Sequence, residues 1–298
     1  MIGELAALAG AFTWAITSIM IKDPIIKVGA VTVNTVRTWI GAGVFVSLML
    51  ITGETEQLFA IPLYNAFALV ASMILGLGIG DTLYFASLRH IGVAKSMPIS
   101  GSYPLPTLLL AAIFLGEPLT WIRGLGTIVI LASVYLISMP SRTAGARLVA
   151  PDSAGTSVRK GFIFSGLAAL LWACATVLLK SGVGTADLIV SNSLRLTAAA
   201  IVLTLMAFRQ PGGLKLRGFG WKTLGVIALS GVIGTALGSA LYLTAVTYAG
   251  AGKASALQTV APFFAAPLAL IFLKERINHA TLIGTALSVV GVWLLIGF

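Results

Sequence analysis

One carboxylate stands alone in an apolar stretch of this sequence. Asp81 follows GLGIG and precedes TLYFASL, so it lies deep inside a segment with the composition of a buried helix. A carboxyl group in such a place can carry a proton through a transport cycle or bind an amine. Two structural roles are also open, an ion pair with Arg37 and a hydrogen bond with Tyr84 one helical turn away.

Two arginines, Arg37 and Arg195, also occur about eight residues into apolar segments. The planar guanidinium suits a carboxylate or a phosphate of a ligand. The alternative is a scaffold role, in which the side chain reaches towards the membrane surface. Asn34 precedes Arg37 by one helical turn on the same face and fits either role.

Other polar side chains occur just before prolines. Ser100 and Tyr103 precede Pro104, and Gln258 precedes Pro262. Proline removes a backbone donor and frees carbonyl groups that a neighbouring helix or a ligand must satisfy. We therefore expect these segments to line a binding site.

Aromatic residues complete the candidate set. Tyr84 and Tyr242 either line the site or lie at the membrane interface. Trp14 either stacks on a ligand or anchors its helix. The predicted substrate-binding or coupling residues are Asp81, Arg37, Asn34, Tyr84, Ser100, Tyr103, Gln258, Arg195, Tyr242 and Trp14.

We predict no metal site, no cofactor and no catalytic residues. Cys174 is the one cysteine, which excludes an intramolecular disulfide and a cysteine-based metal site. The glycine-rich stretches GLGIGD and GVIGTALGSA lack a following GK[ST] and suit close helix packing instead of phosphate binding. An integral-membrane enzyme is the least favoured class, because the acidic residues of the loops occur singly.

The composition excludes an ordinary soluble domain. Of 298 residues, 58% are hydrophobic and 9% charged, whereas soluble domains are about 25% charged. The net charge of +10 comes without a lysine- or arginine-rich run, so we expect a lipid bilayer and not nucleic acid as its partner. The oligomeric state stays open.

Apolar runs of about 20 residues are long enough to cross a bilayer. We predict an all-α integral membrane protein with ten transmembrane helices. They lie near residues 4–22, 29–52, 62–88, 94–115, 120–139, 162–181, 187–208, 221–248, 252–273 and 279–297.

The two halves of the sequence match at a constant offset of 158 residues. The matched pairs include Trp14/Trp172, Asn34/Asn192, Arg37/Arg195, Gly80/Gly238, Tyr84/Tyr242, Pro104/Pro262 and Glu117/Glu275, whereas Asp81 matches Ser239. Because each half has five helices, the second half enters the membrane from the opposite side, which makes an inverted-topology repeat. We predict a first repeat over residues 1–140, a linker over 141–160 and a second repeat over 161–298. Inverted repeats are typical of secondary transporters, which bind substrate between their halves.

Basic residues predict the orientation. Fourteen of the 19 lysines and arginines fall on the side of the 141–160 linker and three on the other side. The positive-inside rule then places the linker in the cytoplasm and both termini outside a cell inner (plasma) membrane.

These features resemble the drug/metabolite transporter superfamily, specifically its EamA-type members with two five-helix repeats. The resemblance rests on the paired first-helix tryptophans, the paired Asn-x-x-Arg motifs and the runs YPLPTLLLAAIFLGEPLT and APFFAAPLALIFLKERIN. It implies export or exchange of small metabolites. It also implies cytoplasmic termini, and here we follow the charges instead.

The predicted function is a secondary transporter that exports or exchanges a small polar metabolite, such as an amino acid, by alternating access. Protons are a candidate coupling ion through Asp81. The alternative is a carrier or flippase of a nucleotide-linked or lipid-linked sugar, which anion-binding arginines would favour.

Overall fold

The computed structural model is all-helical in the residues that it describes, which are 1–91, 96, 99–137, 158–184, 186–209, 213–214, 220–273 and 279–297. Six helical segments of this part are long and apolar enough to cross a membrane: Ile2–Met20, Val31–Thr52, Leu63–Tyr84, Val158–Val183, Leu188–Phe208 and Trp221–Ala249. Shorter apolar helices cover Pro104–Leu115, Trp121–Ile137 and Leu282–Ile296. The chain is therefore an all-helical multi-pass membrane protein.

Helices occupy most of the described residues in each of the ten predicted segments. The first half contains α1 (Ile2–Met20), α2 (Lys22–Val28), α3 (Ala30–Thr52), α4 (Thr55–Ala60), α5 (Leu63–Met73), the π-helix η1 (Ile74–Gly80), α6 (Asp81–Ile91), α8 (Pro104–Leu115) and α9 (Trp121–Ile137). The short helices α2 and α4 lie in or beside ranges that we predicted as connections. Residues 141–157 of the predicted linker lie outside the described residues.

The second half follows the same order, except that its described residues contain no counterparts of the short helices α2 and α4. It contains α10 (Val158–Val183), α11 (Leu188–Arg209), α12 (Trp221–Ser230), the π-helix η2 (Gly231–Leu237), α13 (Gly238–Ala249), α14 (Ala251–Gln258), α15 (Ala261–Leu273) and α16 (His279–Gly297). Glu275, which we matched to Glu117, lies outside the described residues.

The helix predicted over 252–273 is divided in two. Pro262 has no N–H to donate to the carbonyl of Gln258, so α14 ends at Gln258 and α15 begins at Ala261. Pro104 likewise cannot donate to the carbonyl of Ser100, which accepts from the N–H of Tyr103 over 3.2 Å instead, and α8 begins at that proline after a turn over 101–103. The prolines thus divide these segments, which we predicted as continuous helices.

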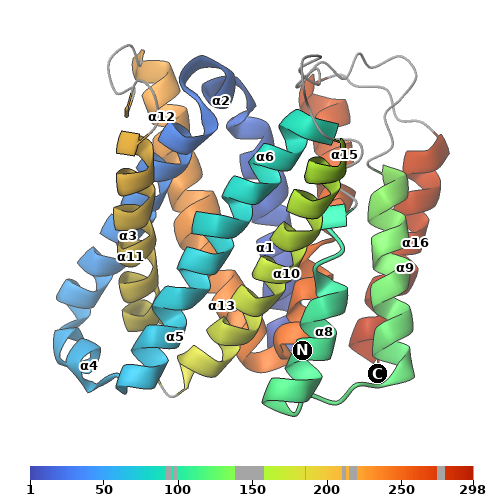
Figure 1. Cartoon of the computed structure of the whole chain (residues 1–298), viewed down its shortest axis with the longest axis horizontal. Coiled ribbons are helices and arrows are strands. Elements are labelled where there is room, and N and C mark those ends of the chain that lie inside the picture. Colours follow the sequence, from blue (N-terminus) through green and yellow to red (C-terminus); the bar gives the residue numbers. More distant parts are fainter. Residues whose placement is uncertain are drawn as a thin grey trace.

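The helices pack in pairs that mix the two halves. Helix α1 packs against α13, and α3 packs against α11 and η2. Helix α10 packs against α5 and α6, and α9 packs against α16. Both chain termini lie at one end of the molecule, and α2 lies at the opposite end (Figure 1).

Glycines at matched positions of the two halves let neighbouring helices approach each other closely. A Cβ atom on Gly3 would lie 2.4 Å from the backbone nitrogen of Ala249, so α1 and α13 touch there without side chains between them. A Cβ atom on Gly161 would lie 2.4 Å from a side-chain atom of Ile91, which brings α10 equally close to α6. Such contacts let apolar helices pack tightly in a membrane.

Candidate functional site

Asp81 lies where the π-helix η1 passes into α6. Gly80, the residue before it, faces the indole of Trp172, and a Cβ atom there would lie 2.8 Å from that ring. The indole nitrogen of Trp172 donates a hydrogen bond of 3.0 Å to Asp81 Oδ1. The described residues contain no ion pair between Asp81 and Arg37, so the first of our structural alternatives is wrong for this conformation. π-helical turns are rare and occur often at functional sites.

Two predicted tyrosines surround the same indole. The ring centroid of Tyr84 lies 5.5 Å from that of Trp172, and the ring of Tyr103 approaches edge-on at 5.9 Å. The first pair is tilted at 53°, and the second has the edge-on geometry that aromatic pairs favour. Trp172 therefore forms the centre of a cluster that residues of three helical segments share.

Hydroxyl groups continue this cluster towards the second half. Tyr242 and Thr176 share a hydrogen bond of 2.9 Å between their hydroxyl oxygens. The Tyr242 hydroxyl also interacts with that of Tyr103, which donates over 3.3 Å to the carbonyl of Ser255. The turn before α8 and the helices α10, α13 and α14 thus meet through polar contacts.

Arg195 has a defined set of partners. Its Nη1 donates to Asn192 Oδ1 over 3.3 Å, and its Nη2 lies 3.5 Å from the sulfur of Met73. Ser239 donates over 2.7 Å to the same Asn192 oxygen. This contact joins α11 to α13 and satisfies part of the guanidinium, which favours a positioning role for Arg195.

Arg37 is as buried as its counterpart Arg195, with exposed fractions of 8% and 5%, and the Nε of each lacks a hydrogen-bond partner. Arg37 differs in what its Nη atoms meet. Its Nη2 lies against Gly234 of η2, where a Cβ atom would be 2.6 Å away. Arg37 forms no hydrogen bond or ion pair with another described residue. The neighbouring Asn34 is partly exposed.

The structure separates three other predicted residues from the Trp172 cluster. Trp14 is 55% exposed and does not contact Asp81. Ser100 is buried and donates to the carbonyl of Ser96 over 2.9 Å, which makes it a local scaffold residue. Gln258, the last residue of α14, lies against Gly10 of α1, and both of its amide atoms are buried without partners.

Trp172, Thr176, Asn192 and Ser239 belong to these polar contacts although we did not include them in the candidate set. Trp172 and Asn192 were visible in the sequence as the repeats of Trp14 and Asn34. Nothing in the sequence indicated which member of each pair would make the contacts.

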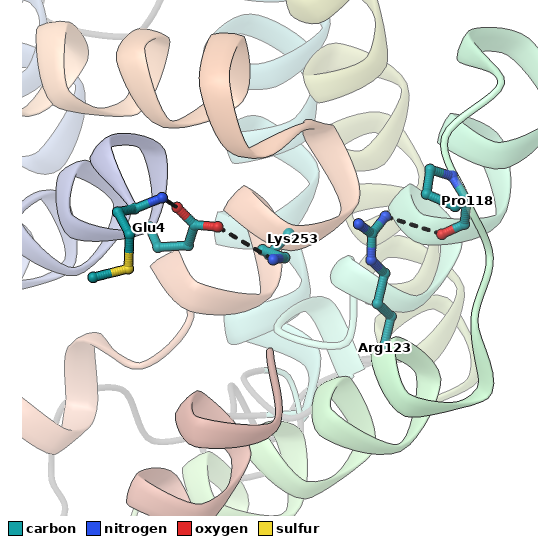
Figure 2. Close-up of polar contacts among 5 residues, drawn as sticks. Glu4, Pro118, Arg123 and Lys253 are labelled. Carbon is teal, nitrogen blue, oxygen red and sulfur yellow. Dashed lines mark hydrogen bonds and ion pairs between the residues drawn. The ribbon is translucent and has the colours of Figure 1, made fainter. Parts of the chain in front are cut away.

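Charged contacts at the end that holds the termini are structural in character (Figure 2). Lys253 of α14 lies 3.2 Å from Glu4 of α1, and Arg123 donates to the carbonyl of Pro118 over 3.0 Å. The described residues contain no group of three or more His, Cys, Asp or Glu side chains that could hold a metal ion.

Glu117 acts across the two halves. Its two carboxylate oxygens accept hydrogen bonds of 2.6 Å and 3.1 Å from the backbone nitrogens of Ala251 and Gly252. They cap the first turn of α14, where unpaired N–H groups and the helix dipole favour an anion. Glu117 thus ties the end of α8 in the first half to the start of α14 in the second.

Comparison with known proteins places this chain in a family. The model of the EamA-like transporter family matches residues 1–139 and 159–297. An uncharacterized transporter of Archaeoglobus fulgidus is 27% identical over 296 residues, which cover 99% of this chain and 98% of that protein. A probable terminal-alkyne amino-acid exporter of Streptantibioticus cattleyicolor is 34% identical over 128 residues, 42% of this chain and 41% of that protein.

A solved structure, described only as the crystal structure of a protein, has the same fold. Its TM-score is 0.79 at 18% sequence identity, and the match covers 98% of this chain and 94% of that one. At this identity the likeness concerns the fold alone. Because the family model covers nearly the whole sequence in two copies, the chain belongs to the EamA-like transporter family.

Proposed function

We propose that this transporter carries a small polar metabolite, such as an amino acid, by alternating access between two inverted five-helix halves. The observation that carries the proposal is the cluster of Asp81, Trp172, Tyr103 and Tyr242. It brings a carboxylate, an indole and two phenols together between segments of both halves. Substrate sites of inverted-repeat transporters lie at such interfaces.

Matched contacts support the inverted arrangement and the ten crossings that it requires. Gly3 meets Ala249, and the residues 158 positions from each, Gly161 and Ile91, also meet. Each contact joins one half to the other, with the roles of the halves exchanged. An approximate twofold axis in the membrane plane generates this exchange.

A further pair of contacts follows the same rule. Gly76 approaches Ala175, and Gly234, which is 158 positions after Gly76, approaches Thr17, which is 158 positions before Ala175. Both glycines lie in π-helical segments, so the matched geometry extends into the centre of the two halves.

Asp81 gives the site its charge preference. A carboxylate beside aromatic rings suits a substrate amine, because the ring faces and the anion both attract a cation. The same carboxyl group is our candidate for proton coupling. The amino-acid exporter among the relatives supports an amine-bearing substrate.

A carrier of nucleotide-linked or lipid-linked sugars remains the second candidate, and one observation favours it. Arg37 has no anionic partner among the described residues and could receive a phosphate.

Reconstitution in liposomes tests the proposal. Purified protein should exchange labelled amino acids in counterflow from a mixture of amino acids, nucleosides, polyamines and sugar nucleotides. The Asp81→Asn variant should lose at least about tenfold in proton-driven uptake, since one charged hydrogen bond or ion contact is worth that much. The matched control is Asp187→Asn, because Asp187 only caps the start of α11.

The outcomes separate the possible roles of Asp81. Loss of proton-driven uptake with counterflow retained assigns coupling, and equal loss of both assigns substrate binding. Unchanged transport by Asp81→Asn would remove it from the site. Absence of counterflow for every compound would overturn the transport function.

A further inference from the structure

Three residues of each half form a matched set, and hydrogen bonds join the three members in only one of the two sets. In the second half, Ser239 and Arg195 both donate to Asn192 Oδ1, over 2.7 Å and 3.3 Å. The corresponding residues of the first half are Asp81, Arg37 and Asn34. There, Asp81 accepts its hydrogen bond from Trp172 of the other half instead.

The set of the first half, Asp81, Arg37 and Asn34, has the features expected when these three residues have moved apart. Arg37 forms no hydrogen bond with another described residue, whereas Arg195 donates through Nη1 to Asn192 and through Nη2 to Met73. Asn192 is fully buried, whereas Asn34 is partly exposed. At the level of helices, α11 packs against α13, and the described residues show no packing of comparable extent between α3 and α6.

The two sets lie towards opposite ends of the molecule. Asn192 and Arg195 are in the first turns of α11, which begins at the end that holds the termini, whereas α3 begins beside α2 at the opposite end (Figure 1). An inverted-repeat transporter changes its accessible side when its halves exchange conformations. The contact found near one end in this conformation then forms near the other end in the alternate one.

We propose that Asn34 and Arg37 are a second binding position for the Asp81 carboxylate, which forms when the α2 end of the transporter closes. Asp81 leaves Trp172 and takes the place that Ser239 holds in the second half. It accepts hydrogen bonds from the Asn34 amide and the Arg37 guanidinium. This inference rests on the proposed alternating-access function.

The chemistry of the two sets makes the two ends unequal. Ser239 joins Asn192 as a neutral hydroxyl, whereas Asp81 brings a carboxylate to a guanidinium. Charge-assisted hydrogen bonds are about twice as strong as neutral ones. The contact at the α2 end is therefore the stronger of the two, and a substrate amine that binds Asp81 competes directly with it. The unpaired Arg37 is explained because its anion is engaged elsewhere in this conformation.

Distance measurements between two spin labels test the proposal without a substrate. Lys27 of α2 and Val158 of α10 are exposed and lie on the two sides that must approach each other at the α2 end. Both are changed to cysteine in a Cys174→Ala background and labelled in the full chain in liposomes. The parent should show a long and a short distance.

The variants should change the balance between these distances. Arg37→Gln and Asp81→Asn should each lower the ratio of short to long molecules by about tenfold, because each removes a charge-assisted contact. The exchanged pair Asp81→Arg with Arg37→Asp should restore the short distance. The matched control Ser239→Ala should not lower this ratio, since Ser239 belongs to the other set.

The result that overturns the proposal is a short-distance fraction in Arg37→Gln equal to that of the parent. Size-exclusion chromatography and a sharp long-distance peak show that each variant is folded. Counterflow on the same samples keeps the two ideas distinguishable. Distances that shift as expected without counterflow contradict the transport function alone, and counterflow with unchanged distances contradicts the Asp81 contact alone.

Discussion

At the scale of single residues, Trp172 holds the candidate site together through two kinds of contact. Its indole N–H donates a hydrogen bond to Asp81, and its ring contacts the rings of Tyr84 and Tyr103. Phenylalanine keeps an aromatic ring but has no N–H donor, so a substitution separates the two contributions.

We expect Trp172→Phe to lower the rate of substrate exchange by about tenfold, because loss of a hydrogen bond to a charged group costs about 1.5–3 kcal/mol. Its melting temperature should fall by only a few degrees. Exchange assays and thermal melts of the purified protein measure both. Trp14→Phe is the control, since Trp14 is 55% exposed and outside the cluster; equal effects of both changes would argue against a special role for Trp172.

Sequence reasoning selected several of the residues that the structure brings together. The isolation of Asp81, the repeat of Tyr84 and Tyr242 and the place of Tyr103 before a proline were enough to select them. It did not distinguish Trp172 from Trp14, because the two are equivalent in the repeat. Only the packing of α10 against η1 and α6 brings one of them to Asp81, and such long-range packing leaves no local signal.

At the scale of elements, the proline positions could be read from the sequence, but their effect was underestimated. A proline without N–H ends α14 after eight residues, and so short a helix depends on its caps. The side chain that caps the first turn of α14 is Glu117, which is 134 residues away from Ala251 in the sequence. No local pattern could have predicted this contact.

Removal of the Glu117 carboxylate should destabilise the protein. In Glu117→Ala, the N–H groups of Ala251 and Gly252 lose their acceptors, and we expect a loss of about 1–3 kcal/mol. Thermal unfolding in detergent measures it. The control is Glu56→Ala, because Glu56 lies exposed on α4. A Glu117→Ala protein as stable as this control would show that α14 does not need its cap.

At the scale of the whole molecule, the constant offset of 158 residues predicted which segments correspond. It could not predict that corresponding residues such as Arg37 and Arg195 have different surroundings. In the proposed transport cycle, that difference belongs to one conformation, whereas the sequence is the same in all of them.

The distribution of basic residues makes a prediction for the whole molecule in the membrane. A reporter that is active only in the cytoplasm should be inactive when fused after Phe298 and active when inserted in the central linker. Because both termini lie at one end of the molecule, a fusion before Met1 should behave as the C-terminal fusion does (Figure 1). Activity of the C-terminal fusion would reverse the predicted orientation.

The two π-helical segments carry a historical consequence. Each has seven residues, and η1 and η2 occupy nearly equivalent places in the two halves. Because π-helices are rare in proteins, a single origin is more economical than two. Under the proposed inverted repeat, the wide turn beside Asp81 is then older than the duplication. An ancestral chain of five helices already had it, and two such chains in opposite orientations formed the earliest version of this transporter.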